Sequence, residues 1–281
     1  MRFLYVAPRY HTNQVPIIRG LKRKGHEVCF LSQYAGKVED YSDLTPTVIG
    51  YSGFFLFFDR IYMALMKNRD AYAGDRKMKC GFPPIGKLKR AIRDSHGDVA
   101  VLRERSVYSI CAYLLCKKYK IPAILYNQSP LWEDCIKNDP AHRLMRLLTP
   151  TVRMTPVMGV QDDRKVKEPG AAFVPFVMEP EQKAEEKRWI KNGITHIFSI
   201  GKYEERKNHR MLVEIVEELS AVYNIHLTIA GERTTSAHQA YYDRLAAYIA
   251  DHGLQDKVTL LANLNRQQVA EQYRKADLFV I

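Results

Sequence analysis

The residues best suited to chemistry lie between 197 and 211, where a strand-like run leads into a glycine and a basic loop. Gly201 would let the backbone approach a ligand closely, because glycine has no side chain. Lys202 and Lys207 bring two ammonium groups to the same loop. The helix that follows would offer free N–H groups and the positive end of its dipole to an anion. The segment predicts a diphosphate site, although a solvated basic loop would have the same charges.

A regular alternation of strands and helices surrounds this segment. The expected elements, in chain order, are a strand at 195–200, a helix at 211–222, a strand at 225–230, a helix at 241–252, a strand at 258–261, a helix at 267–275 and a strand at 277–281. Such alternation is typical of a parallel sheet with helices on both faces. Because the last strand would be central in its sheet, we expect this domain to be incomplete and the natural protein to continue past Ile281.

The first half of the chain alternates in the same way. Its expected elements are strands at 3–7, 28–31, 98–102, 121–126 and 171–177, and helices that end at Gly25 and span 107–119. The sequence therefore predicts an α/β protein with two doubly wound domains, at residues 1–170 and 195–281. Residues 171–194, which become polar and rich in charge, are the expected linker.

Four consecutive segments resemble the retaining glycosyltransferases of family 4, the glycosyl transferases group 1, which have the GT-B fold of two Rossmann-like domains. Residues 197–209 resemble the strand–G-R-x(4)-K-G segment of that family. Residues 227–232, 258–264 and 273–280 resemble its L-x-I-x-G-x-G, V-x-F-x-G-x-V and Y-x-x-A-D-x-F-V runs, in the same order. The resemblance implies an enzyme that transfers a sugar, with retention, from a nucleoside diphosphate sugar to a saccharide or lipid-linked acceptor, in surface polysaccharide or glycolipid synthesis.

The resemblance also assigns roles in the C-terminal domain. Gly201, Lys202 and Lys207 would hold the diphosphate of the donor, which is a co-substrate, and neither a cofactor nor a metal is implied. The residues that would lie against the nucleotide are Gly231, Glu232, Ala262 and Asn263. Lys202 replaces the family's arginine, so a point charge stands in place of a bidentate fork. Asn208 and Ala262 each replace a glycine of the family pattern.

The family's E-x(7)-E segment, whose glutamates lie near the donor sugar and the ribose, would follow a strand like 277–281 and is missing. The chain thus carries a phosphate clamp without a sugar clamp, which puts its own turnover in question. Base identity, donor sugar and acceptor are not specified by the residues present.

Catalytic and acceptor-binding candidates lie in the N-terminal domain. Gln128 stands where the family often has a histidine near the reacting carbon, and glutamine cannot act as a base at neutral pH. Arg103, at the end of another strand, replaces a second frequent histidine. The loop after the first strand supplies His11 as a further catalytic candidate, together with possible acceptor ligands, namely Arg9, Thr12 and Asn13. Thr12 or Asn13 could equally serve as the N-cap of the next helix.

The charge distribution separates the two halves. The chain of 281 residues has a net charge of +12, and residues 1–170 contain 29 Lys and Arg against 16 Asp and Glu. Segment 54–93 combines a phenylalanine-rich run with many cations, which suits either peripheral contact with an anionic membrane or a core helix followed by a solvated loop. With no signal peptide, no spanning run and five cysteines without metal or disulfide spacing, we expect a cytoplasmic protein, in part at the inner face of the membrane.

Other functions remain open at this stage. The missing glutamates, Gln128 and Ala262 favour a degenerate relative that binds nucleotide as a partner subunit without transferring sugar. A sugar-nucleotide epimerase would share the fold but matches residues 197–211 less well. A nucleic-acid-binding protein is suggested only by the basic half, and no nucleic-acid motif supports it. The acidic pair Asp162 and Asp163 is expected to be solvated, not metal-binding.

Overall fold

The computed structural model describes two compact units, Met1–Met178 and Glu179–Ile281. The described residues are 1–36, 39, 41–65, 76–104, 106–135, 140–161, 164–176 and 187–281. Three features of the sequence analysis lie outside them: the basic residues Lys67 and Arg69, the acidic pair Asp162 and Asp163, and residues 177–186 of the expected linker. Each unit is considered by itself below.

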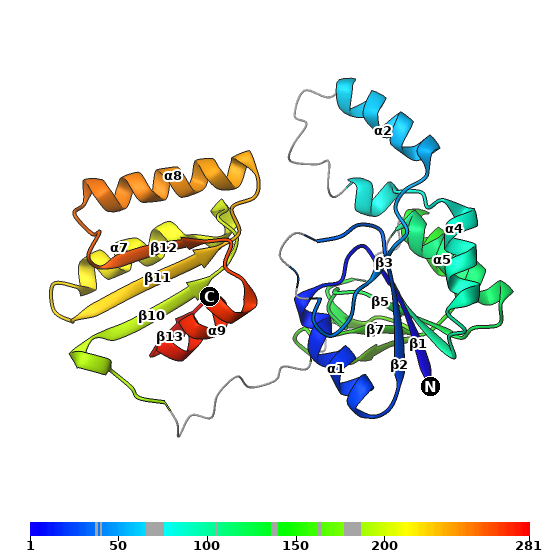
Figure 1. Cartoon of the computed structure of the whole chain (residues 1–281), viewed down its shortest axis with the longest axis horizontal. Coiled ribbons are helices and arrows are strands. Elements are labelled where there is room, and N and C mark those ends of the chain that lie inside the picture. The colour runs from blue at the N-terminus through cyan, green and yellow to red at the C-terminus, as the bar shows by residue number, and fades with distance from the viewer. Residues whose placement is uncertain are drawn as a thin grey trace. The chain divides into compact units, whose positions relative to one another are not determined.

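The first unit is built on a seven-stranded sheet of order β3-β2-β1-β4-β5-β7-β9 (Figure 1). Its strands are β1 (Arg2–Ala7), β2 (Glu27–Ser32), β3 (Thr47–Val48), β4 (Val99–Arg103), β5 (Ala123–Tyr126), β7 (Arg153–Thr155) and β9 (Ala171–Phe173). Every pairing in this sheet is parallel. A separate antiparallel pair is formed by β6 (Trp132–Glu133) and β8 (Val166–Lys167).

Helices cover both faces of this sheet, as a doubly wound fold requires. The described helical segments of this unit are η1 (Thr12–Gln14), α1 (Val15–Arg23), α2 (Gly53–Leu65), α4 (Ile85–Asp94), α5 (Val107–Lys118) and α6 (Pro140–Leu148), of which α1, α4 and α5 pack on the sheet. One core cluster joins alternate residues of β1 and β4, such as Leu4 and Leu102, to α4 and α5. The residues between them, such as Tyr5 and Val101, form a second cluster with α1. Because side chains alternate between the two faces of a strand, β1 and β4 contribute apolar residues to the core on each face of the sheet.

The boundary of the first unit differs from the expected one. β9 (Ala171–Phe173) pairs with β7, so these residues belong to the N-terminal sheet although residues 171–194 were expected to be linker. The unit extends to Met178, and the second begins within the expected linker. β9 covers the first three residues of the strand expected at 171–177, and residues 174–176 are not part of a strand.

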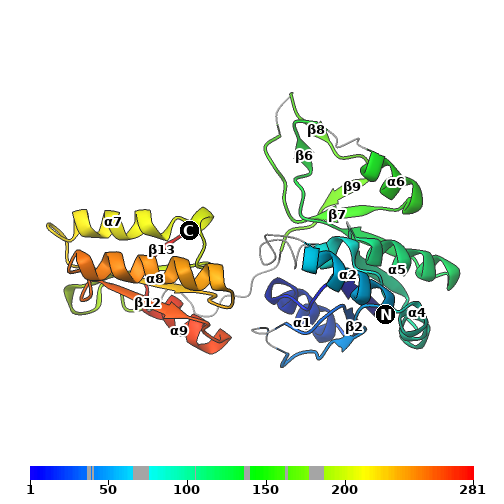
Figure 2. The ribbon, with the colours of Figure 1, turned by 90° about the horizontal axis from the view of Figure 1, so that it is seen from above.

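The second unit has a four-stranded parallel sheet of order β12-β11-β10-β13. Its elements are η3 (Lys191–Gly193), β10 (Thr195–Ile200), η4 (Glu205–Lys207), α7 (His209–Leu219), β11 (Ile225–Gly231), α8 (Ser236–Asp251), β12 (Val258–Ala262), α9 (Arg266–Lys275) and β13 (Leu278–Val280). Helices α7 and α8 lie on one face and α9 on the other, which the two views agree on (Figures 1 and 2). The predicted α/β fold with parallel sheets is confirmed.

Strand order reverses once in each sheet. In the first unit the chain moves outward from β1 to β3 and then from β4 to β9 in the opposite direction, so β1 and β4 flank the reversal. In the second unit β10 and β13 flank it. Ligands of open α/β sheets bind at the carboxyl ends of strands at such a switch point. These ends are followed by the loop Pro8–Gln14 and by Gly201 and Lys202.

Helix α2, at the start of segment 54–93, is not the core helix that was one of the two interpretations of this segment. Its large apolar side chains are exposed: Phe54 by 74%, Phe57 by 61% and Leu65 by 80%. Figure 1 shows α2 standing away from the sheet of its unit. Within the part of the chain that the structure describes, no helix is long and apolar enough to cross a membrane.

Candidate functional site

A pocket of about 190 Å³ opens at the switch point of the first unit. The β1 loop and the ends of β4 and β5 contribute five of the six predicted catalytic and acceptor residues to its lining, namely Arg9, His11, Asn13, Arg103 and Gln128. Thr12 is not among the lining residues. The fold therefore brings together side chains that are more than 100 residues apart in the sequence. We call this cavity the switch-point pocket.

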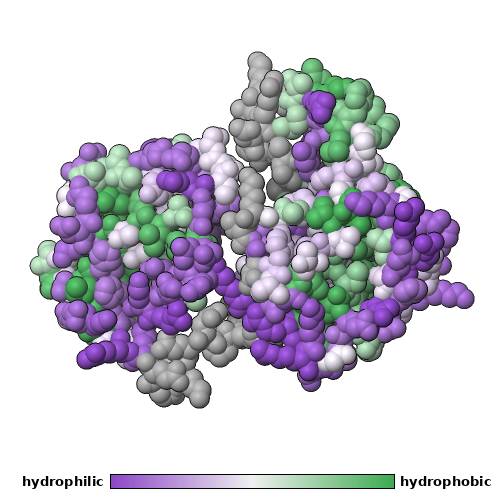
Figure 3. Space-filling model, in the orientation of Figure 1, coloured by the Kyte–Doolittle hydropathy of each residue, from purple (hydrophilic) through white to green (hydrophobic). Residues whose placement is uncertain are grey.

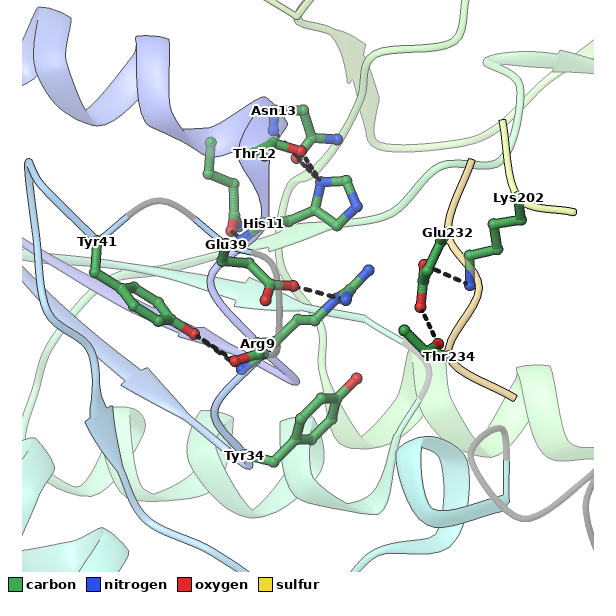
Figure 4. Close-up of polar contacts among 12 residues, drawn as sticks. Arg9, His11, Thr12, Asn13, Tyr34, Glu39, Tyr41, Lys202, Glu232 and Thr234 are labelled. Carbon is green, nitrogen blue, oxygen red and sulfur yellow. Dashed lines mark hydrogen bonds and ion pairs between the residues drawn. The ribbon is translucent and has the colours of Figure 1, made fainter. Parts of the chain in front are cut away.

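Arg9 is held by an acidic residue that sequence reasoning did not single out. Its Nη1 lies 2.6 Å from Oε1 of Glu39, whose side chain is only 3% exposed. Figure 4 shows the two side chains pointing toward each other, close to Tyr41. Because Glu39 neutralises the guanidinium, Arg9 in this arrangement favours hydrogen bonding to a neutral group over holding a phosphate.

His11 organises the start of the following helix. Its side chain receives the backbone N–H of Asn13 as the N-cap of η1, while Gln14 Oε1 accepts the His11 amide at 2.9 Å. The cap is therefore His11, whereas Thr12 or Asn13 was the expected one. Nδ1 of His11 also lies 2.9 Å from Oδ1 of Asn13 (Figure 4). Desolvation of the ring, followed by the positive charge of Arg9, lowers the pKa of His11. The ring is thus kept neutral near pH 7.

Arg103 and Gln128 form a pair across the ends of β4 and β5. Nη2 of Arg103 donates to Oε1 of Gln128 at 2.9 Å, and the guanidinium lies 4.9 Å from the centre of the Tyr126 ring. Burial raises the pKa of Tyr126, so its hydroxyl stays protonated. The wall of the pocket therefore presents hydrogen-bond donors and acceptors to a ligand, without an anionic base among these three side chains.

The predicted phosphate-binding residues meet at the carboxyl end of β10 in the second unit. The Gly201 amide donates to the carbonyl of Ala230 on β11, 2.9 Å away. The stem of Lys207 lies over Gly201, since a Cβ added there would come within 3.3 Å of Cγ and Cδ of Lys207. Asn208 follows in the left-handed region at φ 48°, a conformation that glycine adopts readily. The replacement of the family's glycine by asparagine is compatible with this turn.

Lys202 and Glu232 link the ends of β10 and β11. Nζ of Lys202 lies 3.5 Å from Oε2 of Glu232, and the hydroxyl of Thr234 donates to Oε1 of Glu232 at 2.7 Å (Figure 4). Burial raises the pKa of Glu232, but the Thr234 hydrogen bond and the Lys202 charge outweigh it and lower the pKa below its ordinary value. Glu232 is thus ionised and oriented, and it can position Lys202.

A close approach of the two strands explains why Gly231 is a glycine. A Cβ at this position would lie 2.4 Å from the carbonyl oxygen of Gly201 and 2.7 Å from the Tyr203 ring. The hydroxyl of Tyr203, which is fully buried, lies 3.0 Å from the Ile229 carbonyl and 2.8 Å from the Leu261 carbonyl. Burial raises the pKa of Tyr203. Tyr203 therefore ties together three strand ends that carry predicted site residues.

The other two predicted nucleotide residues lie at the end of β12. Ala262 pairs with Gly231. Asn263 has φ 55°, and its amide donates to the Gly231 carbonyl at 2.9 Å. Its side chain accepts from the Arg233 amide at 2.7 Å and donates to the Arg233 carbonyl at 3.2 Å. The side chain of Asn263 thus braces the loop after β11.

His209 is a residue of this site that sequence reasoning missed. It is 1% exposed, and its Nε2 lies 3.2 Å from the Lys202 carbonyl oxygen. Burial lowers the pKa of His209, so the neutral ring with a proton on Nε2 can donate to that carbonyl. The signal available in the sequence was its position directly after Asn208, at the first turn of the helix.

The start of α7 also differs from expectation. The amide of Arg210 donates to the hydroxyl of Tyr241 at 3.3 Å, so this N–H is not free for an anion as predicted. The Tyr241 hydroxyl, on α8, instead accepts from one of the backbone N–H groups that have no partner within the first turn of α7. The positive charge available to a phosphate at this site therefore resides mainly in Lys202 and Lys207.

Comparison with known proteins finds a family similarity in the second unit. Residues 181–281 match the family model described as "Glycosyl transferases group 1". No curated protein matches the chain. This match covers the segment with Gly201, Lys202 and Lys207 and all four strands of the second sheet.

Solved structures show the same fold over the whole chain. A glycosyltransferase from Rickettsia africae is 14% identical, with a TM-score of 0.60 over 99% of this chain and 72% of that one. A UDP-forming α,α-trehalose-phosphate synthase from Burkholderia xenovorans is 12% identical, with a TM-score of 0.59 over 99% and 77%. A sucrose-phosphate synthase from Thermosynechococcus elongatus is 8% identical, with a TM-score of 0.55 over 100% and 75%. Residues 181–281 are therefore similar to the glycosyl transferases group 1, in a chain that has the GT-B fold throughout.

Proposed function

We propose that the protein transfers a sugar, with retention of configuration, from a nucleoside diphosphate sugar to a saccharide or lipid-linked acceptor. The observation that carries the proposal is the pair of lysines, Lys202 and Lys207, beside Gly201 at the switch point of the unit that is similar to the glycosyl transferases group 1. Two ammonium groups match the two charges of a diphosphate. Synthesis of a surface polysaccharide or glycolipid is the process in which we place this reaction.

The lysines would act on the leaving group. As the bond between the sugar and the diphosphate breaks, negative charge accumulates on the diphosphate, and fixed cations stabilise it. Glu232, 3.5 Å from Lys202, would orient that ammonium group. His209 would hold the backbone of Lys202 in place through its carbonyl. The acceptor would bind among Arg9, Asn13, Arg103 and Gln128, whose polar groups suit sugar hydroxyls.

Calorimetric titration with UDP, GDP and ADP tests the donor site. One nucleotide should bind, and Lys207→Ala should weaken it by about 10- to 100-fold, because a hydrogen bond to a charged group contributes about 1.5–3 kcal/mol. Lys275→Ala, an exposed lysine at the end of α9 in the same unit, is the matched control and should leave affinity unchanged. Binding of none of the three, or equal binding by both variants, would contradict the proposal.

Turnover separates a transferase from a nucleotide-binding relative that has lost activity. The measurement is release of the nucleoside diphosphate from its sugar conjugates in the presence of saccharide acceptors. Release that depends on acceptor supports transfer. Tight nucleotide binding without any release would favour the partner-subunit alternative for this chain.

We propose further that α2 rests on an anionic membrane surface. Phe54, Phe57, Phe58, Ile61 and Leu65 recur at helical spacing and are each at least 43% exposed. Figure 3 shows an apolar surface over this helix. On its other side Asp59 is buried and pairs with Arg76 and with Lys77, 3.5 Å away. An exposed apolar stripe combined with exposed cations, here Lys87, Lys89 and Arg90 on α4 of the same unit, is the combination that binds anionic bilayers.

Vesicle sedimentation tests this surface. The protein should bind vesicles that contain phosphatidylglycerol, bind phosphatidylcholine vesicles far less, and lose binding when Phe54, Phe57 and Leu65 are changed to Ser. A triple change of similar size on the exposed face of α7 and its following turn, Met211→Ser, Leu219→Ser and Val222→Ser, is the matched control. Binding that persists in the α2 variant would show that this helix is not the contact.

A further inference from the structure

A second pocket, of about 420 Å³, lies in the first unit at the ends of β4, β5 and β7. Its wall is completed by α5, α6, β6 and β9, and Figure 2 shows α6 and the β6–β8 pair standing out beyond β7 and β9. Its size falls within the range of about 300–1,000 Å³ that is usual for small-molecule sites. None of its lining residues lines the switch-point pocket.

The polar wall of the second pocket is a buried ion pair. Nε of Arg153 lies 2.8 Å from Oε1 of Glu104, and each side chain is 8% exposed. Asn127 Nδ2 donates to Oε2 of Glu104 at 2.8 Å, and Nη1 of Arg153 reaches the Thr151 carbonyl at 3.3 Å. Among the described residues, nothing accepts a hydrogen bond from Nη2 of Arg153, which is buried. Both Glu104 and Arg153 line the cavity, and the carboxylate of Glu104 is the hydrogen-bonding group that the pair offers to a ligand.

The charges around the cavity cancel. Three acidic and three basic side chains line it, in addition to His142. Glu104 pairs with Arg153, and Glu168 pairs with Arg146 at 3.3 Å. Lys79 and Glu133 are the remaining two. An anionic ligand would therefore bring an uncompensated charge next to three carboxylates, which a neutral ligand avoids.

The lining also includes apolar side chains, namely Val107 and Ile110 from α5, Pro130, and Met145 from α6. A sugar ring has a polar rim of hydroxyls and C–H groups on its faces. A sugar hydroxyl can donate its proton to a lone pair of the Glu104 carboxylate. The C–H groups would then pack against the apolar side chains.

The second pocket is joined to the proposed acceptor site by consecutive residues. Arg103 and Gln128 form their hydrogen bond in the switch-point pocket, whereas the next pair, Glu104 and Asn127, forms its bond in the second pocket. We propose that the second pocket binds an uncharged sugar unit of the acceptor, which makes the acceptor a saccharide longer than one residue. This inference rests on the proposed glycosyl transfer.

Saturation-transfer NMR on the full chain tests the pocket. The probes are methyl glucoside, methyl galactoside, methyl mannoside and methyl N-acetylglucosaminide, with glucuronate and inorganic phosphate as charged comparators. At least one neutral glycoside should receive saturation. Ile110→Phe fills the cavity from α5 without changing its charge and should abolish the signal. Leu114→Phe makes the same kind of change on an exposed position of the same helix and should preserve it.

UDP, GDP and ADP titrations of both variants distinguish the two proposals, because the predicted donor residues lie in the other unit. Loss of the glycoside signal in Ile110→Phe with nucleotide binding retained supports the sugar pocket. Three results would overturn it: no neutral glycoside binds, only the charged comparators bind, or Ile110→Phe binds as the wild type does. Sugar binding without any nucleotide binding would leave the pocket in place and contradict the transferase instead.

Discussion

The residues around the two predicted lysines differ in how firmly they are held. Lys207 covers Gly201 with its stem, and Lys202 is attached to Glu232 at its head and to His209 at its backbone. His209 is the most buried of these residues, and its interactions are the most sensitive to pH. Its other ring nitrogen, Nδ1, is buried without a partner among the described residues. Protonation of Nδ1 would bury a positive charge without a hydrogen-bond acceptor for the new N–H group, which is unfavourable.

His209 should make the stability of the second unit depend on pH. Its pKa is lowered in the folded state by burial, whereas the unfolded chain takes up a proton near pH 6.5. Below about pH 6.5 the unfolded state therefore binds more protons, and the free energy of unfolding falls as pH falls toward the folded pKa. Hydrogen-exchange protection of β10 and β11 amides should decrease over this window. In His209→Gln the decrease should be smaller, and a slope equal to the wild type's would contradict the argument.

The sequence located some of these residues and not others, for physical reasons. Gly201, Lys202 and Gly231 lie at strand ends that the local pattern predicts, and Lys207 lies in the turn that follows β10, so their meeting could be foreseen. The buried pair of Glu104 and Arg153 could not, because it joins positions 49 residues apart and depends on which strands are neighbours. The sequence analysis selected Arg103, the residue before Glu104, and its side chain lines the switch-point pocket instead of the second pocket.

At the scale of elements, hydrophobic periodicity predicted β10, α7 and β11 closely, because the apolar face of α7 packs against the two strands that flank it in the sequence. It was less successful for α8, which begins at Ser236, with Thr235 as its N-cap, instead of at Tyr241. The apolar residues of α2 show why pattern alone is insufficient. A stripe of phenylalanines indicates a helix but does not say whether protein covers it, and here the stripe is exposed.

Because the ends of β10 and β11 are in close contact, Gly231 and Gly201 should differ in how well they tolerate a side chain. Gly231→Ala would place a methyl group against the backbone of Gly201 and the buried Tyr203 ring. It should cost about 1–3 kcal/mol, or about 4–8 °C in Tm for each kcal/mol in a unit of this size. Gly201→Ala meets only the flexible Lys207 stem and the His209 ring edge at 3.3–3.4 Å, so its loss should be smaller. Calorimetry of the two variants decides the order, and equal losses would contradict the geometry.

For the whole molecule, charge and core are both divided between the units. The first unit has 29 basic and 16 acidic residues, the second 14 and 15. Each buried cluster of apolar residues lies within one unit: two in the first and two in the second, among the described residues. The basic unit, which contains the proposed acceptor pockets, and the near-neutral unit, which contains the lysines proposed to bind phosphate, are thus two separately built bodies.

Two separate cores should unfold as two transitions, and the chain carries a reporter for each. Of its two tryptophans, Trp132 lies in the first unit and Trp189 in the second. In Trp189→Phe, fluorescence should follow the first unit, and adding Arg153→Met should lower that transition, because removing one partner of a buried ion pair costs about 3–5 kcal/mol. In Trp132→Phe, fluorescence should follow the second unit, which should respond to Gly231→Ala and not to Arg153→Met. If each core variant shifted both transitions equally, the two units would have to unfold as one cooperative body.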